Sequence, residues 1–240
     1  MSAASAPSPN SQRSQGTESH SAGLPDSPAL QHAEASRPHR LLGRAEFLRA
    51  IEQHGRLFSN AARLLFAALP TSAFGDSVTR ELHALHACAQ QQQREVVSRL
   101  QVTLITPLDA EDIYKILSSL TRLIGSFHRV SGTVSNLPQR AVFPQLPGLC
   151  DASLQVSEAL RGVATDLKSP RALQYFLVTI RAADRELRKL LRESLSDAYS
   201  AKSPIPHLPV QLDLLKQYLA LRRRFKQTAA LLQQIHFKNV

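Results

Sequence analysis

The sequence has no tryptophan, and aromatic residues make up only 5% of its 240 positions. This scarcity is atypical of an aromatic-rich β-sandwich and favours leucine and alanine packing between helices. The two cysteines, Cys88 and Cys150, are too few for a disulfide framework or a four-cysteine zinc site. Apolar residues still account for 43% of the chain, which is enough for the core of one sizeable domain or two small ones.

Long apolar runs are also missing. The longest, such as residues 64–69, span about two turns of helix, whereas a membrane-spanning helix needs roughly 18 apolar residues. The N-terminus lacks a charged stretch followed by an apolar stretch, so we expect no signal peptide. These features predict a reduced, cytoplasmic protein without a membrane span.

Two shifts in composition divide the chain. Residues 1–40 contain nine serines and five prolines but no valine, isoleucine, phenylalanine or tyrosine. We therefore expect a disordered tail there and a helical bundle over residues 41–240. The net charge of +10 is also uneven, because residues 170–240 hold 13 basic and 5 acidic groups, a balance of +8. A partner attracted by charge would therefore meet the last third of the chain.

From Gly43 onward, apolar residues recur every three or four positions, as on one face of an α-helix. No segment alternates with the period of a strand for more than a few residues. The pattern predicts an all-α fold, an antiparallel six-helix bundle, in which a proline-rich loop that includes Pro147 precedes the fourth helix. The apolar stripes of the six helices lie at residues 47–69, 82–100, 113–134, 154–167, 173–191 and 212–235.

Three of the helix starts carry capping residues. Asp76 is the predicted N-cap of the second helix, and Ser169, followed by Pro170, is that of the fifth. The start of the third helix satisfies several preferences of a helix N-terminus at once. Thr106 is the predicted N-cap, Pro107 the first helical residue and Asp109 the N3 residue. Glu111 and Asp112 then place negative charge at the positive end of the helix dipole.

The segment 105–120, ITPLDAEDIYKILSSL, resembles a motif of the PhoU-like phosphate transport regulators, which accompany Pit-type low-affinity phosphate transporters. The stretches 47–69 and 233–240 are similar to the opening and the ending of that family. The resemblance implies a PhoU-like bundle of two related three-helix layers over about residues 45–240. Its specific part consists of Thr106, Pro107, Asp109, Glu111, Asp112 and Ile113.

Several members of this family hold metal clusters between helices through repeated E-x-x-x-D pairs, whose carboxylates share one helix face. In this sequence the corresponding positions are His86 and Gln90, Thr121 and Gly125, and Ile180 and Asp184, with the arginine-rich stretch 221–224 in the sixth helix. These positions hold a single carboxylate among several guanidinium groups. We therefore expect no metal and no cofactor.

Two further sites are conceivable from the sequence. His83, His86 and Cys88 do not converge at helical spacing, which favours chance over a zinc site. The helix start at Ser169-Pro170-Arg171 offers free backbone N–H groups and is the better candidate for binding phosphate directly, because acidic residues occupy the start of the third helix.

The resemblance implies a non-enzymatic, cytoplasmic accessory or regulatory protein of inorganic phosphate transport. Its expected partner is a Pit-type transporter, which it would meet at the inner face of the membrane. An anionic membrane surface and a second copy of the chain stay open as further partners. A merely solvated helix face is an equally good interpretation of the candidate contact residues, which are Arg181, Arg185, Arg188, Lys189, Arg192, Arg222, Arg223, Arg224 and Lys226.

The alternative function is that of a basic helical nucleic-acid-binding protein, because the basic last third would release counterions from a phosphate backbone. The sequence shows no helix-turn-helix spacing, zinc finger or aromatic stacking platform, so no specific nucleic acid is expected. An enzyme is the least supported function, since nucleophile motifs, phosphate-binding glycine loops and zinc-protease motifs are all missing.

Overall fold

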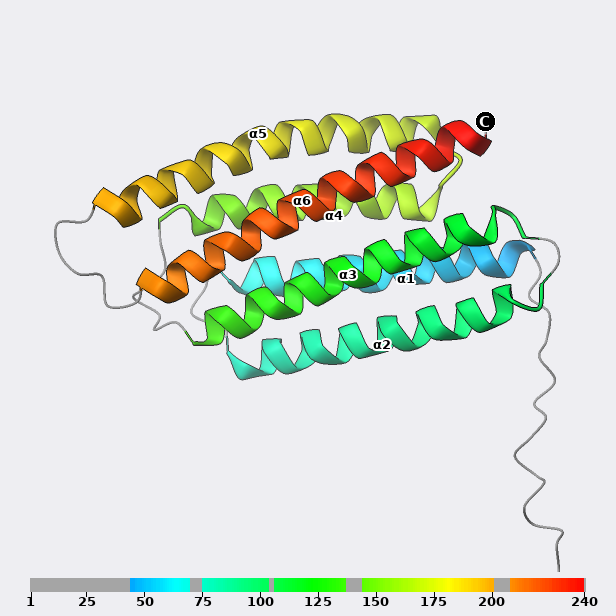
Figure 1. Cartoon of the computed structure of the whole chain (residues 1–240), viewed down its shortest axis with the longest axis horizontal. Coiled ribbons are helices and arrows are strands. Elements are labelled where there is room, and N and C mark those ends of the chain that lie inside the picture. Colours follow the sequence, from blue (N-terminus) through cyan, green and yellow to red (C-terminus); the bar gives the residue numbers. More distant parts are fainter. Residues whose placement is uncertain (1–43, 70–74, 104–105, 137–143, 201–207, 240) are drawn as a thin grey trace, which may run out of the picture. The chain divides into compact units, whose positions relative to one another are not determined.

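A computed structural model describes residues 44–69, 75–103, 106–136, 144–200 and 208–239, all of which belong to the unit Arg40–Val240. These residues form six helices and no strand, which confirms the predicted all-α fold (Figure 1). The helices are α1 (Arg44–Ala68), α2 (Asp76–Leu100), α3 (Ala110–Ser135), α4 (Leu146–Thr165), α5 (Pro170–Ser200) and α6 (Leu208–Asn239). The tail predicted over residues 1–40 lies outside the described residues.

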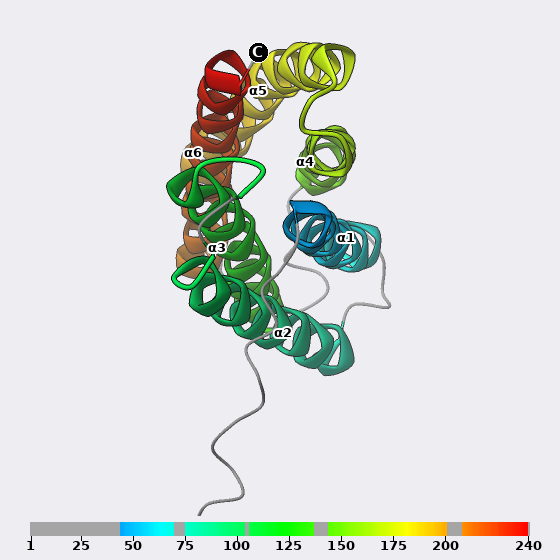
Figure 2. The same cartoon turned by 90° about the vertical axis from the view of Figure 1, so that its right-hand side faces the viewer.

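The six helices pack as two layers of three, and consecutive helices run in opposite directions (Figures 1 and 2). In the first layer, α1, α2 and α3 all contact one another, and in the second, α5 contacts both α4 and α6. The layers are joined where α1 packs against α4 and where α3 packs against α6. This arrangement confirms the predicted antiparallel bundle of two three-helix layers.

Four buried phenylalanines connect the two layers. Phe127 of α3 stacks on Phe58 of α1, with ring centroids 5.5 Å apart, and meets Phe66 of α1 edge-on at 5.2 Å. On its other side, Phe127 lies 6.5 Å from Phe225 of α6. Full burial of one such side chain stabilises a fold by roughly 1.5–3 kcal/mol. The cluster therefore contributes strongly to holding α1, α3 and α6 together.

The start of α3 differs from the prediction. Asp109, not Thr106, is the N-cap, and the helix begins at Ala110. The hydroxyl of Thr106 donates a hydrogen bond to the carbonyl oxygen of Leu108 at 2.5 Å, and both Pro107 and Leu108 are buried. Packing these two side chains into the core requires a turn at this point, so the prediction that Thr106 caps the helix is wrong.

The starts of two other helices also differ from the prediction. Gly75, rather than Asp76, is the N-cap of α2, and Asp76 is its first residue. α4 begins at Leu146 and includes Pro147, which the sequence placed in the preceding loop. Proline fits the first turn of a helix because the N–H that it lacks would have no partner inside the helix.

None of the six helices in the described part of the chain is both long and apolar enough to cross a membrane.

Candidate functional site

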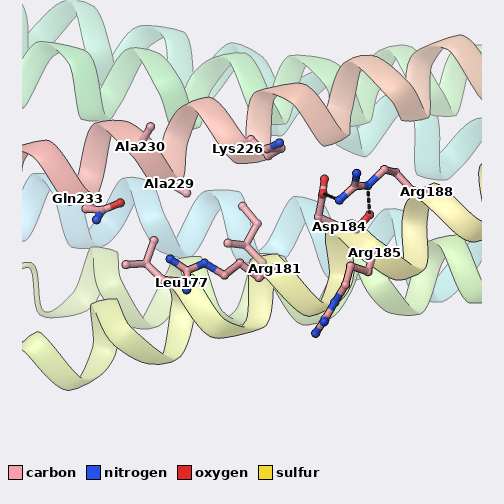
Figure 3. A pocket seen from close by; sticks show the side chains of 10 residues that line it. Leu177, Arg181, Asp184, Arg185, Arg188, Lys226, Ala229, Ala230 and Gln233 are labelled. Atoms are coloured by element: carbon pink, nitrogen blue, oxygen red, sulfur yellow. Dashed lines mark hydrogen bonds and ion pairs between the residues drawn. The ribbon is translucent and has the colours of Figure 1, made fainter.

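A groove of about 560 Å³ runs between α5 and α6 (Figure 3). Its floor is apolar and its rim is basic. The α5 side consists of Leu177, Ile180, Arg181, Asp184, Arg185 and Arg188, and the α6 side of Lys226, Ala229, Ala230 and Gln233. Helical spacing explains this grouping, because residues three and four apart lie on the same face of a helix. The groove thus brings four of the nine predicted contact residues together.

Asp184, the single carboxylate of the groove lining, is 7% exposed and is shared between two arginines. Its Oδ1 lies 2.5 Å from Nε of Arg222 on α6, and its Oδ2 lies 2.9 Å from Nη2 of Arg188 (Figure 3 shows the contact with Arg188). Burial by itself raises the pKa of Asp184. The hydrogen bond and the charge of Arg222 outweigh this effect, together with the charges of Arg188 and Lys226, so the pKa of Asp184 lies below its usual value. Asp184 is therefore ionised and links α5 to α6.

The other groove cations have no such partner among the residues that the structure describes. None of the ion pairs between described residues includes Arg181, Arg185 or Lys226. Because Asp184 is already neutralised by two arginines, the groove has an excess of positive charge over an apolar floor. An acidic segment with an apolar side is the ligand that such a surface fits best.

The remaining predicted contact residues point in several directions. Lys189, Arg192 and Arg223 are exposed but do not line the groove. The side chain of Arg222 is 16% exposed and its guanidinium faces Asp184, whereas Arg224 faces α3 and donates to the carbonyl oxygen of Arg122 at 2.8 Å. Neighbouring residues of a helix are about 100° apart, so the arginine run 222–224 does not form one surface.

In α2 and α3, the positions where the family resemblance implied acidic pairs hold neutral side chains. The imidazole of His86 on α2 lies against Gly125 on α3, where a Cβ atom would be only 2.8 Å from Nε2 of His86. Burial, and then the charges of His128, Arg129 and His83, lower the pKa of His86 below its usual value. A neutral imidazole therefore occupies the space between α2 and α3.

The third-helix position Thr121 is also engaged in the interior. Its Oγ1 lies 2.8 Å from Nε2 of His54 on α1 and donates to the carbonyl oxygen of Leu117 at 2.9 Å. His54 is fully buried, and burial lowers its pKa to about 4, against a smaller opposing effect of Gln92. This contact joins α1 to α3 without any charge.

Three histidines meet where α2 packs against α3, a grouping that the sequence did not reveal. The ring of His128 lies 5.1 Å from that of His83 and 6.3 Å from that of His86. Cys88 is exposed and takes no part in these ring contacts. In the described part of the chain, no three His, Cys, Asp or Glu side chains are arranged to hold a metal ion. His128 lies more than 40 positions from His83, so no local spacing could have indicated it.

The acidic part of the motif at 105–120 connects the two layers. Lys238, in the last turn of α6, binds the carboxylates of Asp109 and, at 3.1 Å, of Asp112. Glu111 pairs with Lys115 one turn later on α3, and Ile113 is fully buried. Asp109 and Asp112 thus connect the start of α3 to the end of α6.

The candidate phosphate-binding helix start has a conventional cap. The hydroxyl oxygen of Ser169 accepts a hydrogen bond from the backbone N–H of Ala172 at 3.2 Å, and α5 begins at Pro170, as predicted. Arg171 is exposed. Ser169 therefore uses one of the N–H groups that a phosphate would need.

Comparison with known proteins relates the chain through its structure alone. No protein-family model and no curated protein matches the sequence. Among solved structures, a PhoU-like protein from Shewanella oneidensis MR-1 superimposes with a TM-score of 0.61 at 14% identity, covering 80% of this chain and 99% of that protein. A candidate PhoU-like phosphate regulatory protein from the same organism gives a TM-score of 0.60 at 15% identity, with the same coverage. The chain therefore has the PhoU-like fold that the resemblance of its sequence implied.

Proposed function

We propose that this protein is a non-enzymatic regulator of inorganic phosphate transport that acts by contact with a Pit-type membrane transporter from the cytoplasmic side. One of the proteins that share its fold is described as a candidate phosphate regulatory protein. The observation that carries the proposal is the groove between α5 and α6, where Arg181, Arg185 and Lys226 lie over an apolar floor and form no ion pair with any described residue.

The occupant proposed for this groove is an acidic, amphipathic segment of the transporter. Carboxylates of that segment would pair with Arg181 and Arg185, and its apolar side would cover Ile180 and Leu177. Exposed apolar side chains of α5 continue the surface, since Tyr175 is 66% and Val178 58% exposed. Exposed apolar residues next to unpaired charges are typical of a surface for a protein partner.

The lining also supports binding rather than catalysis. Among the residues that line the groove, all of them described, there is no serine, cysteine or histidine to serve as nucleophile or base. The one carboxylate, Asp184, is held by Arg222 and Arg188 and has a lowered pKa, so it is a poor proton acceptor.

Co-purification with a Pit-type transporter in detergent tests the proposal. The wild-type protein is expected to capture the transporter at low salt and to release it at high salt, because salt screens exposed charges. The double variant Arg181→Glu/Arg185→Glu is expected to lose the capture. Arg94→Glu, a reversal at an exposed position of α2, is the matched control and is expected to retain it.

Two results would contradict the proposal. One is failure of the wild-type protein to bind the transporter at any salt concentration, and the other is equal loss of binding in Arg94→Glu.

A filter-binding titration with duplex DNA tests the alternative function. Retention of DNA at low salt without capture of the transporter would replace the proposed function with nucleic-acid binding.

A further inference from the structure

Three arginines meet at the contact between α3 and α6, away from the groove. Nη1 of Arg224 on α6 donates to the carbonyl oxygen of Arg122 and to Oγ of Ser126, each at 2.8 Å. Nη2 of Arg129 donates to the same Ser126 oxygen at 3.2 Å. One hydroxyl thus holds two guanidinium groups, and we call Arg122, Arg129 and Arg224 the arginine cluster.

The arginine cluster has no carboxylate partner in the described part of the chain. None of the ion pairs between described residues includes Arg122, Arg129 or Arg224. By contrast, Arg222, only two residues before Arg224, has a carboxylate at 2.5 Å. Three like charges from two helices repel one another, so their grouping favours binding of an anion.

The local field also indicates unbalanced positive charge. Arg224 is half-buried, and burial, followed by the charges of Arg129 and Arg122, lowers its pKa below the usual value. The charge of Arg129 likewise adds to burial in lowering the pKa of His128. An anion placed at this point would relieve the repulsion.

A cavity of about 330 Å³ opens beside the cluster. Its lining includes Arg122 and Arg224, together with Lys115, Ser118 and Ser119 of α3, and contains no carboxylate among its residues, all of them described. Pockets for small ligands begin at about 300 Å³, so the cavity suits a small anion or one group of a larger ligand. Arginine forks and hydroxyl groups are the usual donors to phosphate oxygens.

We propose that this cavity binds a phosphate group, held by the guanidinium groups of Arg122 and Arg224. The phosphate group belongs either to free inorganic phosphate or to a chain of phosphates such as tripolyphosphate. The site is separate from the groove between α5 and α6, and its occupancy does not require the transporter contact.

Isothermal titration of the full chain with inorganic phosphate, and separately with tripolyphosphate, in chloride buffer tests the site. Arg122→Gln and Arg224→Gln are expected to weaken binding about tenfold or more, because each removes a charge-assisted hydrogen bond. Arg223→Gln is the matched control, since it removes the same charge from an exposed neighbour on α6, and it is expected to leave the affinity unchanged within about twofold.

Each outcome has a definite meaning. Heat with inorganic phosphate that is lost in Arg122→Gln identifies the free anion as the ligand, and heat with tripolyphosphate alone identifies the chain. No heat with either probe, or equal weakening in Arg223→Gln, overturns the proposal. If Arg224→Gln unfolds, as circular dichroism would show, Arg122→Gln decides the result, because the Arg122 side chain forms no ion pair among the described residues. Transporter capture by Arg122→Gln is expected to persist, which separates this site from the proposed function.

Discussion

The buried histidine His54 makes the stability of the fold depend on pH. Its ring is 0% exposed, and its Nε2 donates to Thr121 Oγ1, whose own proton goes to the carbonyl oxygen of Leu117. The folded protein therefore holds a neutral imidazole. Burial lowers its pKa from 6.5 to about 4, which the nearby Gln92 only partly opposes.

The sign of the effect follows from these two pKa values. In the unfolded chain the imidazole gains a proton as the pH falls through 6.5, whereas in the folded protein it stays neutral until about pH 4. Acid therefore stabilises the unfolded state, and the loss of stability is complete near the lower value. Between about pH 7.5 and about pH 5, the free energy of unfolding is expected to fall by about 2 kcal/mol from this group alone.

Urea denaturation followed by helical circular dichroism, at both pH values, measures this loss. His54→Gln removes the titrating group but keeps a side chain that can donate to Thr121, so it is expected to lose about 2 kcal/mol less than the wild type. His86 and His128, whose pKa values are also lowered, act in both proteins alike and cancel in the difference. An equal loss in the wild type and His54→Gln would refute the reasoning.

Three further substitutions test the packing. Phe127→Ala is expected to lower the free energy of unfolding by about 3–5 kcal/mol, because it empties the centre of the phenylalanine cluster; a loss below about 1 kcal/mol in urea denaturation would contradict that role. Asp184→Asn removes the charged carboxylate that joins α5 to α6 and should lower the free energy of unfolding by about 1.5–3 kcal/mol in the same assay. Glu186→Gln, at an exposed neighbour, should leave the free energy of unfolding nearly unchanged. Gly125→Ala places a methyl group where the His86 ring lies and should push the ring toward solvent, so the pKa of His86 measured by NMR should rise toward its usual value. An unchanged pKa would show that the position of the ring does not require a glycine at 125.

Much of the fold was predictable because the helical period of apolar residues is a strong local signal. All six helices exist, and the cap at Ser169 was correctly identified, since the side chain and the following proline act within one turn. The start of α3 was misplaced because Thr106 and Pro107 satisfy the preferences of a helix start and of a turn equally well. The burial of Pro107 and Leu108 decides between these two, and burial depends on residues far away in the sequence.

The candidate site was less predictable than the fold, because its contacts also depend on residues that are far apart in the sequence. The basic residues of α5 were identified from local charge, and four members of the predicted set do line one groove. Arg222 and Arg224 face different neighbours: Arg222 pairs with Asp184 of α5, and Arg224 donates to Ser126 of α3. These partners are distant in the sequence, so the local charge pattern did not indicate them. The contact between Lys238 and Asp112 spans 126 positions, and no sequence pattern within one helix indicates it.

The order of synthesis gives the contact between α3 and α6 a further consequence. On its α6-facing side, α3 contacts Phe225, Thr228 and Lys238 of α6 through Phe127, Ser119 and Asp112. While the ribosome is still making α4 and α5, the α6-facing side of α3 therefore lacks the cover that α6 provides. Exposed apolar surface of this kind invites aggregation of nascent chains. A chain whose translation stalls before residue 208 would thus be a substrate for chaperones, and the bundle closes only when its final helix arrives.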